Sequence, residues 1–329
     1  TNSNRVSVYS VSIDGTIASS PTYIIGQSDA TTTTAGLSAS SLDGPTGVAI
    51  DYVSQILYVA DTNNNRVLSY EVGFGIYTGM SASGVFGQPD FDTNTAGVGA
   101  TSLDHPHGLD VNPGNSILYV ADTNNNRVVV FEGSTTSTGA FGQPDINSNT
   151  AGLTAKRFDH PISVEYTGTG ILVSDSGNNR VLYFTNLNYA TDPLAANVFG
   201  QADFTTATPG TTSTTLSNPV NADYDVSEDA VYIVDSGNNR ILVYDVQGGI
   251  SDGMAATYVM GQSNMTSASA AVTQSGLSGP MAIEIADSLD SVVTTFDPVL
   301  TVRRTLWVAD ASANRLLLYR FTTLANLAS

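Results

Sequence analysis

The sequence lacks cysteine altogether and has one lysine, one tryptophan and three histidines among 329 residues. Without cysteine, the fold holds neither a disulfide nor a cysteine-ligated zinc ion. The chain also lacks an apolar run long enough to cross a membrane as a helix, so membrane insertion is not expected. Eleven cations face 30 acidic residues, which gives a formal net charge of −19. This scarcity of Lys and Arg excludes the basic clusters that nucleic-acid binding requires.

An asparagine-rich turn that closes on an arginine divides the chain into repeats. Its copies recur at similar intervals and end at Arg5, Arg66, Arg127, Arg180, Arg240 and Arg315. A Gly-Gln pair and a proline also recur, and the distance along the chain from glutamine to proline is identical in all five copies, as from Gln27 to Pro45. Such recurrence predicts one supersecondary unit stacked on its own copies, and we expect these arginines to be its structural motif. Because a freely solvated loop tolerates insertions at small cost, the constant length predicts packed loops.

Four short apolar segments bounded by turn residues occupy each repeat. In one repeat they are GVAID, ILYVAD, RVLSYEV and GVFGQ, between residues 47 and 88. Their length and alternation indicate four antiparallel strands, and repeated four-stranded sheets predict an all-β fold, a β-propeller. We expect a single domain, 1–329. The inner two strands occur five times, which favours five blades if the chain is whole, with residues 5–27 completing the last blade beside 316–321. Thr1 matches Thr62 within the motif, so the chain starts inside a repeat as a processed end or a fragment, and a fragment would predict six blades.

The order P-x-G-V-A-x-D, L-Y-V-A-D and N-N-R-V resembles the NHL-repeat β-propeller family over nearly all of the chain. The resemblance implies a propeller that binds at its loop faces. Because that family includes scaffolds, sensors, adhesive surface proteins and a few enzymes, it implies no single activity. The long loops between Gly-Gln and proline depart from the plain family pattern and enlarge one rim.

Acidic residues recur on the first strand of each repeat, four positions after the proline. Period-two alternation places them on one face, with small residues two positions earlier, while Val48 and its equivalents pack between blades. We expect this face to line a central channel, where carboxylates at one level repel unless a cation or raised pKa values compensate them. Calcium suits such an oxygen-rich site. The alternative is a water-filled channel in which each acid caps backbone amides. The candidate metal ligands are Asp110, Glu165, Asp223, Glu284 and Asn221.

Three histidines, His105, His107 and His160, provide a second candidate metal site. His105 and His160 both precede the proline of their repeat, and with His107 they supply the three-histidine set of several catalytic zinc centres. Other repeats carry Gly or Asn at that place, which favours ordinary loop histidines. No nucleophile motif, phosphate loop or paired-cysteine site occurs, so we expect no catalytic residues and no enzyme. The enzymatic alternative is a metal-dependent hydrolase or lyase of the propeller lactonase type.

One repeat is longer than the others, with an insertion at about 287–304. It carries Arg303 and Arg304, a candidate interface on an otherwise acidic chain. We expect a hairpin there that joins copies of the protein, or a loop that seals the closure. The arginine strand occurs six times, so one copy is surplus to five blades. The interpretation is a non-enzymatic assembly unit of a cell-surface layer or filament, joined through this surplus strand or the hairpin. The alternative is a glycan- or peptide-binding surface module that uses the Thr/Ser-rich rim. The Thr, Ser and Asn content with one lysine favours an extracellular or cell-surface location.

Overall fold

The computed structural model describes residues 3–11, 17–294, 297–321 and 323–324, with the backbone alone for 286–304. It confirms the all-β prediction, since the helices in these ranges are six 3-10 turns of three residues each. None of the helices in the described ranges is long and apolar enough to span a membrane. The chain divides into two compact units, residues 1–152 with 188–193 and residues 153–187 with 194–329.

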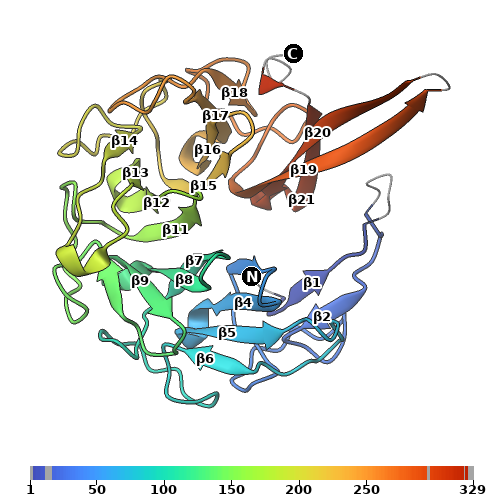
Figure 1. Cartoon of the computed structure of the whole chain (residues 1–329), viewed down its shortest axis with the longest axis vertical. Helices are drawn as coiled ribbons and strands as arrows, with labels where there is room; N and C mark the ends of the chain where they lie inside the picture. Colours follow the sequence, from blue (N-terminus) through green and yellow to red (C-terminus); the bar gives the residue numbers. More distant parts are fainter. Residues whose placement is uncertain (1–2, 12–16, 295–296, 322, 325–329) are drawn as a thin grey trace. The chain divides into compact units, whose positions relative to one another are not determined.

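The first unit contains a small two-stranded sheet and two complete blades (Figure 1). The small sheet pairs β1 (Val6–Val8) with β2 (Tyr23–Ile25). The first blade has the order β3-β4-β5-β6 and the second β10-β9-β8-β7. Their strands are β3 (Gly47–Asp51), β4 (Ile56–Asp61), β5 (Arg66–Glu71), β6 (Gly84–Phe86), β7 (Pro106–Asn112), β8 (Ile117–Asp122), β9 (Arg127–Glu132) and β10 (Gly139–Phe141).

The second unit contains two four-stranded blades and one of three strands. The orders are β11-β12-β13-β14, β15-β16-β17-β18 and β19-β20-β21, all antiparallel. The strands are β11 (Pro161–Tyr166), β12 (Ile171–Asp175), β13 (Arg180–Phe184), β14 (Asn197–Phe199), β15 (Pro219–Asp225), β16 (Ala230–Asp235), β17 (Arg240–Asp245), β18 (Tyr258–Met260), β19 (Pro280–Thr294), β20 (Asp297–Asp310) and β21 (Arg315–Phe321).

Five blades therefore contain the first and second strands of the repeat, and the predicted β-propeller class is confirmed. In the first unit, β1 and β2 form a sheet of their own. Completion of the last blade by residues 5–27 stays a prediction. β1 and β2 are the third and fourth strands of their own repeat, and Val6 pairs with Ile25 just as Val67 pairs with Phe86.

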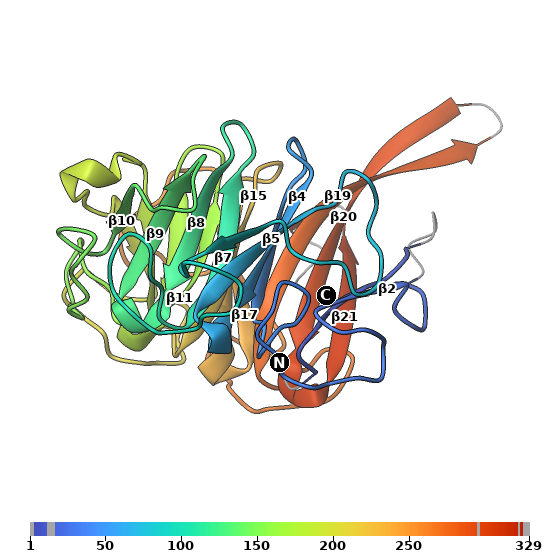
Figure 2. The same ribbon diagram turned by 90° about the horizontal axis from the view of Figure 1, so that it is seen from below.

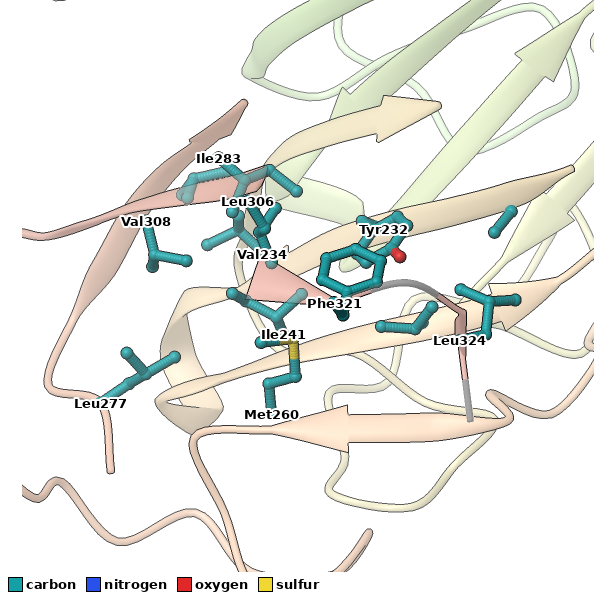
Figure 3. Packing of buried hydrophobic residues seen from close by; sticks show 13 residues of the cluster. Tyr232, Val234, Ile241, Met260, Leu277, Ile283, Leu306, Val308, Phe321 and Leu324 are labelled. Carbon is teal, nitrogen blue, oxygen red and sulfur yellow. The ribbon is translucent and has the colours of Figure 1, made fainter. Parts of the chain in front are cut away.

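Within each unit, the core lies between successive blades. At the position expected to pack there, Leu109, Val164, Ala222 and Ile283 are buried. Figure 3 shows one such layer, in which Ile283, Leu306 and Val308 of the last blade pack against Val234 and Ile241 of the blade before it. Val48 is the exception and is 54% exposed. The repeat before it has only third and fourth strands in its sheet, so nothing of a second strand covers Val48.

Candidate functional site

The repeat arginines connect consecutive loops of the kind that runs from Gly-Gln to proline. Arg66 is fully buried, and its Nε donates to Asp61 Oδ2 at 2.7 Å. Its Nη2 donates to the carbonyls of Ser38 and Ser41 in one loop, and its Nη1 donates to the carbonyl of Phe91 in the next. A planar guanidinium with five donors suits such divergent acceptors. Arg127, Arg180 and Arg240 repeat the pattern, which gives the loops their constant length.

The asparagine before each arginine carries the connection to the next repeat. Asn65 adopts a left-handed backbone with φ of 52°, a region that asparagine tolerates. Its Nδ2 donates to Asn94 O, and its Oδ1 accepts the N–H of His105 at 2.8 Å. Gln88 of the Gly-Gln pair then donates to the carbonyls of Asn65 and Thr95. The constant spacing of these motifs within the chain thus reflects one hydrogen-bonded network that orders the loops.

The histidines have a local explanation. The residue before each repeat proline has a positive φ of 49° to 58° in all five copies, and glycine, asparagine and histidine are residue types found there. His105 and His160 each place Nδ1 near the carboxylate of the preceding aspartate, at 2.9 and 2.5 Å. Burial, with His105 nearby, lowers the pKa of His107. Across the described residues, no three His, Asp or Glu side chains form a group able to hold a metal ion.

Two of the predicted metal ligands join neighbouring first strands. Asn221 Oδ1 on β15 accepts the N–H of Ile283 on β19 at 3.0 Å, and Asp223 Oδ2 accepts the N–H of Ile285 at 2.8 Å. Asp223 Oδ1 also accepts the N–H of Tyr224. First strands do not share a sheet, so their outward amides need side-chain acceptors. For Asp223 this is the amide-capping alternative of the sequence analysis.

The other predicted ligands lie at equivalent places on β7, β11 and β19. Asp110 and Glu165 are partly buried, and Glu284 is exposed. Desolvation nevertheless raises the pKa of Glu284. Water reaches this side chain, but the protein atoms close to it still reduce the hydration of the charged carboxylate. The small residues two positions earlier have a steric cause: a Cβ on Gly47 would lie 2.4 Å from the carbonyl oxygen of His107. Calcium at these carboxylates stays a prediction.

An exposed apolar face marks the start of the blade series. On β3, Val48 and Ile50 are 54% and 51% exposed, whereas their equivalents on β7, Leu109 and Val111, are 6% and 4% exposed. The outer half of this face is covered, since Val6 and Val8 pack against the Ile25 and Leu57 cluster. The inner half is where the first and second strands of a preceding blade would lie. We call Val48, Ile50 and the open edge of β1 the acceptor face.

The last blade carries a long two-stranded ribbon. β19 and β20 pair from Pro280 with Asp310 as far as Thr294 with Asp297, but β21 pairs with β20 only from Asp310 to Arg304. Beyond that point, residues 288–294 and 297–303 continue as a two-stranded ribbon, which Figure 2 shows extending past β21. The segment corresponds to the predicted insertion at about 287–304. Arg303 and Arg304 lie in its β20 strand, and their side chains are outside the described part. We call this segment the donor ribbon.

Comparison with known proteins agrees with this architecture. The family described as NHL repeat matches residues 42–70 and 103–131. This chain is an NHL-repeat β-propeller. Each matched segment runs from the buried loop leucine, Leu42 or Leu103, to the end of an arginine strand, so it contains the proline, the Asp-Arg pair and the asparagine turn. A comparison of the chain with curated proteins found no match.

Solved structures similar to this NHL propeller include proteins of different kinds. An auxiliary nutrient binding protein from Bacteroides thetaiotaomicron has a TM-score of 0.51 and 13% identity, over 97% of this chain and 69% of its own. A periplasmic gluconolactonase from Pseudomonas aeruginosa has a TM-score of 0.46 and 14% identity, over 98% and 80%. A putative 6-phosphogluconolactonase from Bacteroides fragilis has a TM-score of 0.45 and 13% identity, over 87% of this chain and 73% of its own. At these identities the likeness concerns the fold alone.

One group of polar side chains was not predicted from the sequence. Tyr183, Tyr224 and Asp229 line a cavity at the blade ends opposite the asparagine turns. The signal was present, since other repeats place mostly aliphatic residues at the two tyrosine positions. The two tyrosines lie on different blades, on β13 and β15, so no motif shared by the repeats contains them.

Proposed function

We propose that this NHL propeller is a non-enzymatic assembly unit that joins copies of itself in a layer or filament at the cell surface. The observation that carries the proposal is the acceptor face. It combines a sheet that has third and fourth strands only with an exposed Val48, at a position where every later blade has a buried side chain. Val48 and Ile50 together resemble an interior surface left uncovered. Such an apolar surface with an open strand edge is a ready site for another strand.

The occupant we propose is the donor ribbon of a second copy. A first and a second strand are what the β1–β2 sheet lacks, and the ribbon is an extension of a first strand and a second strand. Its segments 287–294 and 297–304 are about as long as the first strands β7 and β15. By period-two alternation, the register places Leu289, Leu300 and Val302 on one face of the ribbon together with Ser291 and the Asp287–Arg304 pair, and we propose that this face lies against β3. The completed sheet would repeat the order of β3-β4-β5-β6.

Acceptor and donor are different surfaces of one chain, so each copy would bind one neighbour at each end. Head-to-tail contacts of this kind build open filaments unless the rotation closes a ring. Arg303 and Arg304 on the ribbon would approach a body with a net charge of −19, which favours encounter at low salt. The composition, rich in Thr and Ser with one lysine, supports the proposed location outside the cell.

The test is the molar mass in solution, measured by light scattering over a concentration series. We expect the wild type to form oligomers that grow with concentration and shrink with salt. Val48→Asp places a charge on the acceptor face and should give a monomer. Val53→Asp is the matched control, because Val53 is 66% exposed in the adjoining turn and outside the proposed contact.

A second variant removes the donor. Ala286 pairs with Thr305 as Asp51 pairs with Ile56, so residues 287–304 can be replaced by the turn sequence of residues 52–55. This variant should also be monomeric, yet a mixture with Val48→Asp should form a 1:1 complex, since each partner retains the surface that the other lacks. A wild type that stays monomeric at every concentration would refute the proposal in favour of closure within one chain. A mixture that forms no complex would refute the ribbon as donor.

A further inference from the structure

A cavity of about 340 Å³ lies in the second unit between the β11–β14 blade and the β15–β18 blade. It is at the blade ends opposite the asparagine turns, where β11 turns into β12 and the chain leaves β17. Leu172, Val231 and Val246 form its apolar floor and are at most 3% exposed. Small-molecule sites in proteins begin at about this volume and typically combine an apolar floor with a few polar groups.

The mouth of the cavity carries hydroxyl and carboxyl groups. Tyr224 OH donates to Asp229 Oδ1 at 2.6 Å, and Tyr183 OH lies 3.3 Å from Thr169 Oγ1. Desolvation first, and then the bond to Asp229, raise the pKa of Tyr224 to about 12, so this hydroxyl keeps its proton at neutral pH. The amide of Asn197 completes the polar lining.

The repeat fold does not require these side chains. At the position of Tyr183, the first, second and fourth blades carry Ser69, Val130 and Val243, and all of these blades form. At the position of Tyr224, the first two blades carry Ile50 and Val111 and the last carries Ile285, while the third carries Tyr166. Tyr183 and Tyr224 pack against the core with their rings, and their hydroxyls add polar groups that the aliphatic residues of other blades lack.

The chemistry of the lining limits the ligand class. No lysine or arginine is among the described residues that line the cavity, which disfavours phosphates and carboxylates. Aromatic rings offer a negative face to polarised C–H groups, while Asp229 and Asn197 provide acceptors and donors for hydroxyls. The volume accommodates one ring-sized molecule rather than a folded partner.

We infer that this cavity is a binding site for a single neutral sugar residue, with the ring against Tyr183 and Tyr224 and its hydroxyls on Asp229 and Asn197. The site is independent of self-assembly, because its residues lie on neither the acceptor face nor the donor ribbon. It would let an assembled layer or an isolated copy hold a saccharide end group.

The probes are glucose, galactose, mannose and N-acetylglucosamine, each at about 10 mM, which would fill most of a site with a Kd near 1 mM. Saturation-transfer NMR on the full chain should detect at least one of them. Tyr183→Val introduces the residue that two other blades use at this position, and Asp229→Gly keeps the left-handed backbone at φ 52° while removing the carboxylate. Each should weaken binding at least tenfold.

A matched control exists elsewhere in the chain. Gln55 has the same left-handed turn position as Asp229, with φ of 56°, and its carbonyl accepts the N–H of Val72 as that of Asp229 accepts Val246. Gln55→Gly should therefore leave binding unchanged. Binding by none of the four sugars would overturn the inference, as would binding that survives both cavity variants. So would binding of tetramethylammonium in place of every sugar, which would assign the cavity to organic cations.

Discussion

Replacing Arg180 with methionine tests the buried arginine network most directly. Arg180 and Asp175 are both fully buried, and the Arg180 Nε donates to Asp175 Oδ2 at 2.7 Å. Its other donors reach the carbonyls of Phe204 at 2.7 Å, Thr154 at 2.9 Å and Arg157 at 2.8 Å. Methionine keeps much of the apolar stem but removes every donor, so the variant leaves one buried carboxylate and three carbonyls without their main partner.

The expected cost is large because one charge of a buried pair loses its counterion. Such losses destabilise proteins by about 3–5 kcal/mol, against a total stability of about 5–15 kcal/mol. With an m-value of about 3 kcal/mol per molar urea, the unfolding midpoint should fall by about 1–2 M. Arg320→Met on the exposed surface of β21 is the control and should change stability by less than about 0.5 kcal/mol.

The pH dependence separates charge from packing. Burial raises the pKa of Asp175 from 3.8 to about 6, while Arg180 opposes that rise. Without Arg180 the pKa of Asp175 in the folded state is higher still. The destabilisation by the unpaired carboxylate is therefore complete above that pKa, and it shrinks as the pH falls and the carboxyl takes up a proton. Urea unfolding at pH 7.5 and pH 5 should show this, and adding Asp175→Asn should recover part of the loss at pH 7.5. A cost below about 1 kcal/mol, or a double variant weaker than Arg180→Met, would refute the reasoning.

Three further predictions concern single side chains. Asp223→Asn should lower the free energy of unfolding by about 1–2 kcal/mol, because charge-assisted bonds to the amides of Tyr224 and Ile285 weaken; a loss of metal-dependent lactone hydrolysis instead would favour the enzymatic alternative. Asn179→Ala should destabilise more than Asn179→Gly by about 1 kcal/mol, since both lose the hydrogen bonds and only alanine is strained at φ 52°; equal thermal midpoints would contradict this. Glu284→Gln should raise stability at pH 7 and not at pH 4, because a raised folded pKa makes the wild type lose stability as the pH rises through it. If calcium binds there, added calcium should stabilise the wild type alone.

The loops show how far the sequence could predict the structure. Five loops of equal length and unlike sequence indicated packing, and the arginine and glutamine side chains provide it. The acceptors of each arginine could not be predicted from the sequence, because Arg66 donates to carbonyls of residues 25 and 28 positions away along the chain. Hydrogen bonds at such separation depend on the stacking of blades, which a repeat predicts only in outline.

The histidines show how a comparison of the repeats decides between a metal site and ordinary loop residues. His105 and His160 suggested a metal because histidine is a common ligand, yet the shared property of this position is a left-handed backbone. Gly44, Asn218 and Gly279 at the same place were the signal. A set of glycine, asparagine and histidine at one repeat position indicates a conformational requirement before it indicates chemistry.

The inner acids were predicted on the right strands, but their roles depend on neighbours that one sequence does not place. Asp223 caps an amide of the next first strand, whereas Glu284 on that next strand is exposed and has a raised pKa. The same repeat position thus carries two electrostatic situations. The difference arises because Asp223 lies beside the next first strand of its own unit, whereas β19, which carries Glu284, is the last first strand within that unit.

The ends of the repeat series follow the same logic as its middle. Within each unit, a blade buries one face on its neighbour, so Val67 and Ile241, directly after their arginines, are fully buried. Val48 on β3 and Leu316 on β21 are both more than half exposed. Six of the eleven cations belong to the repeat arginines, so few remain for a charged surface at these ends. The exposed Val48 and Leu316, with Arg303 and Arg304 in the β20 strand of the donor ribbon, support the proposal that the unit adds to its own copies.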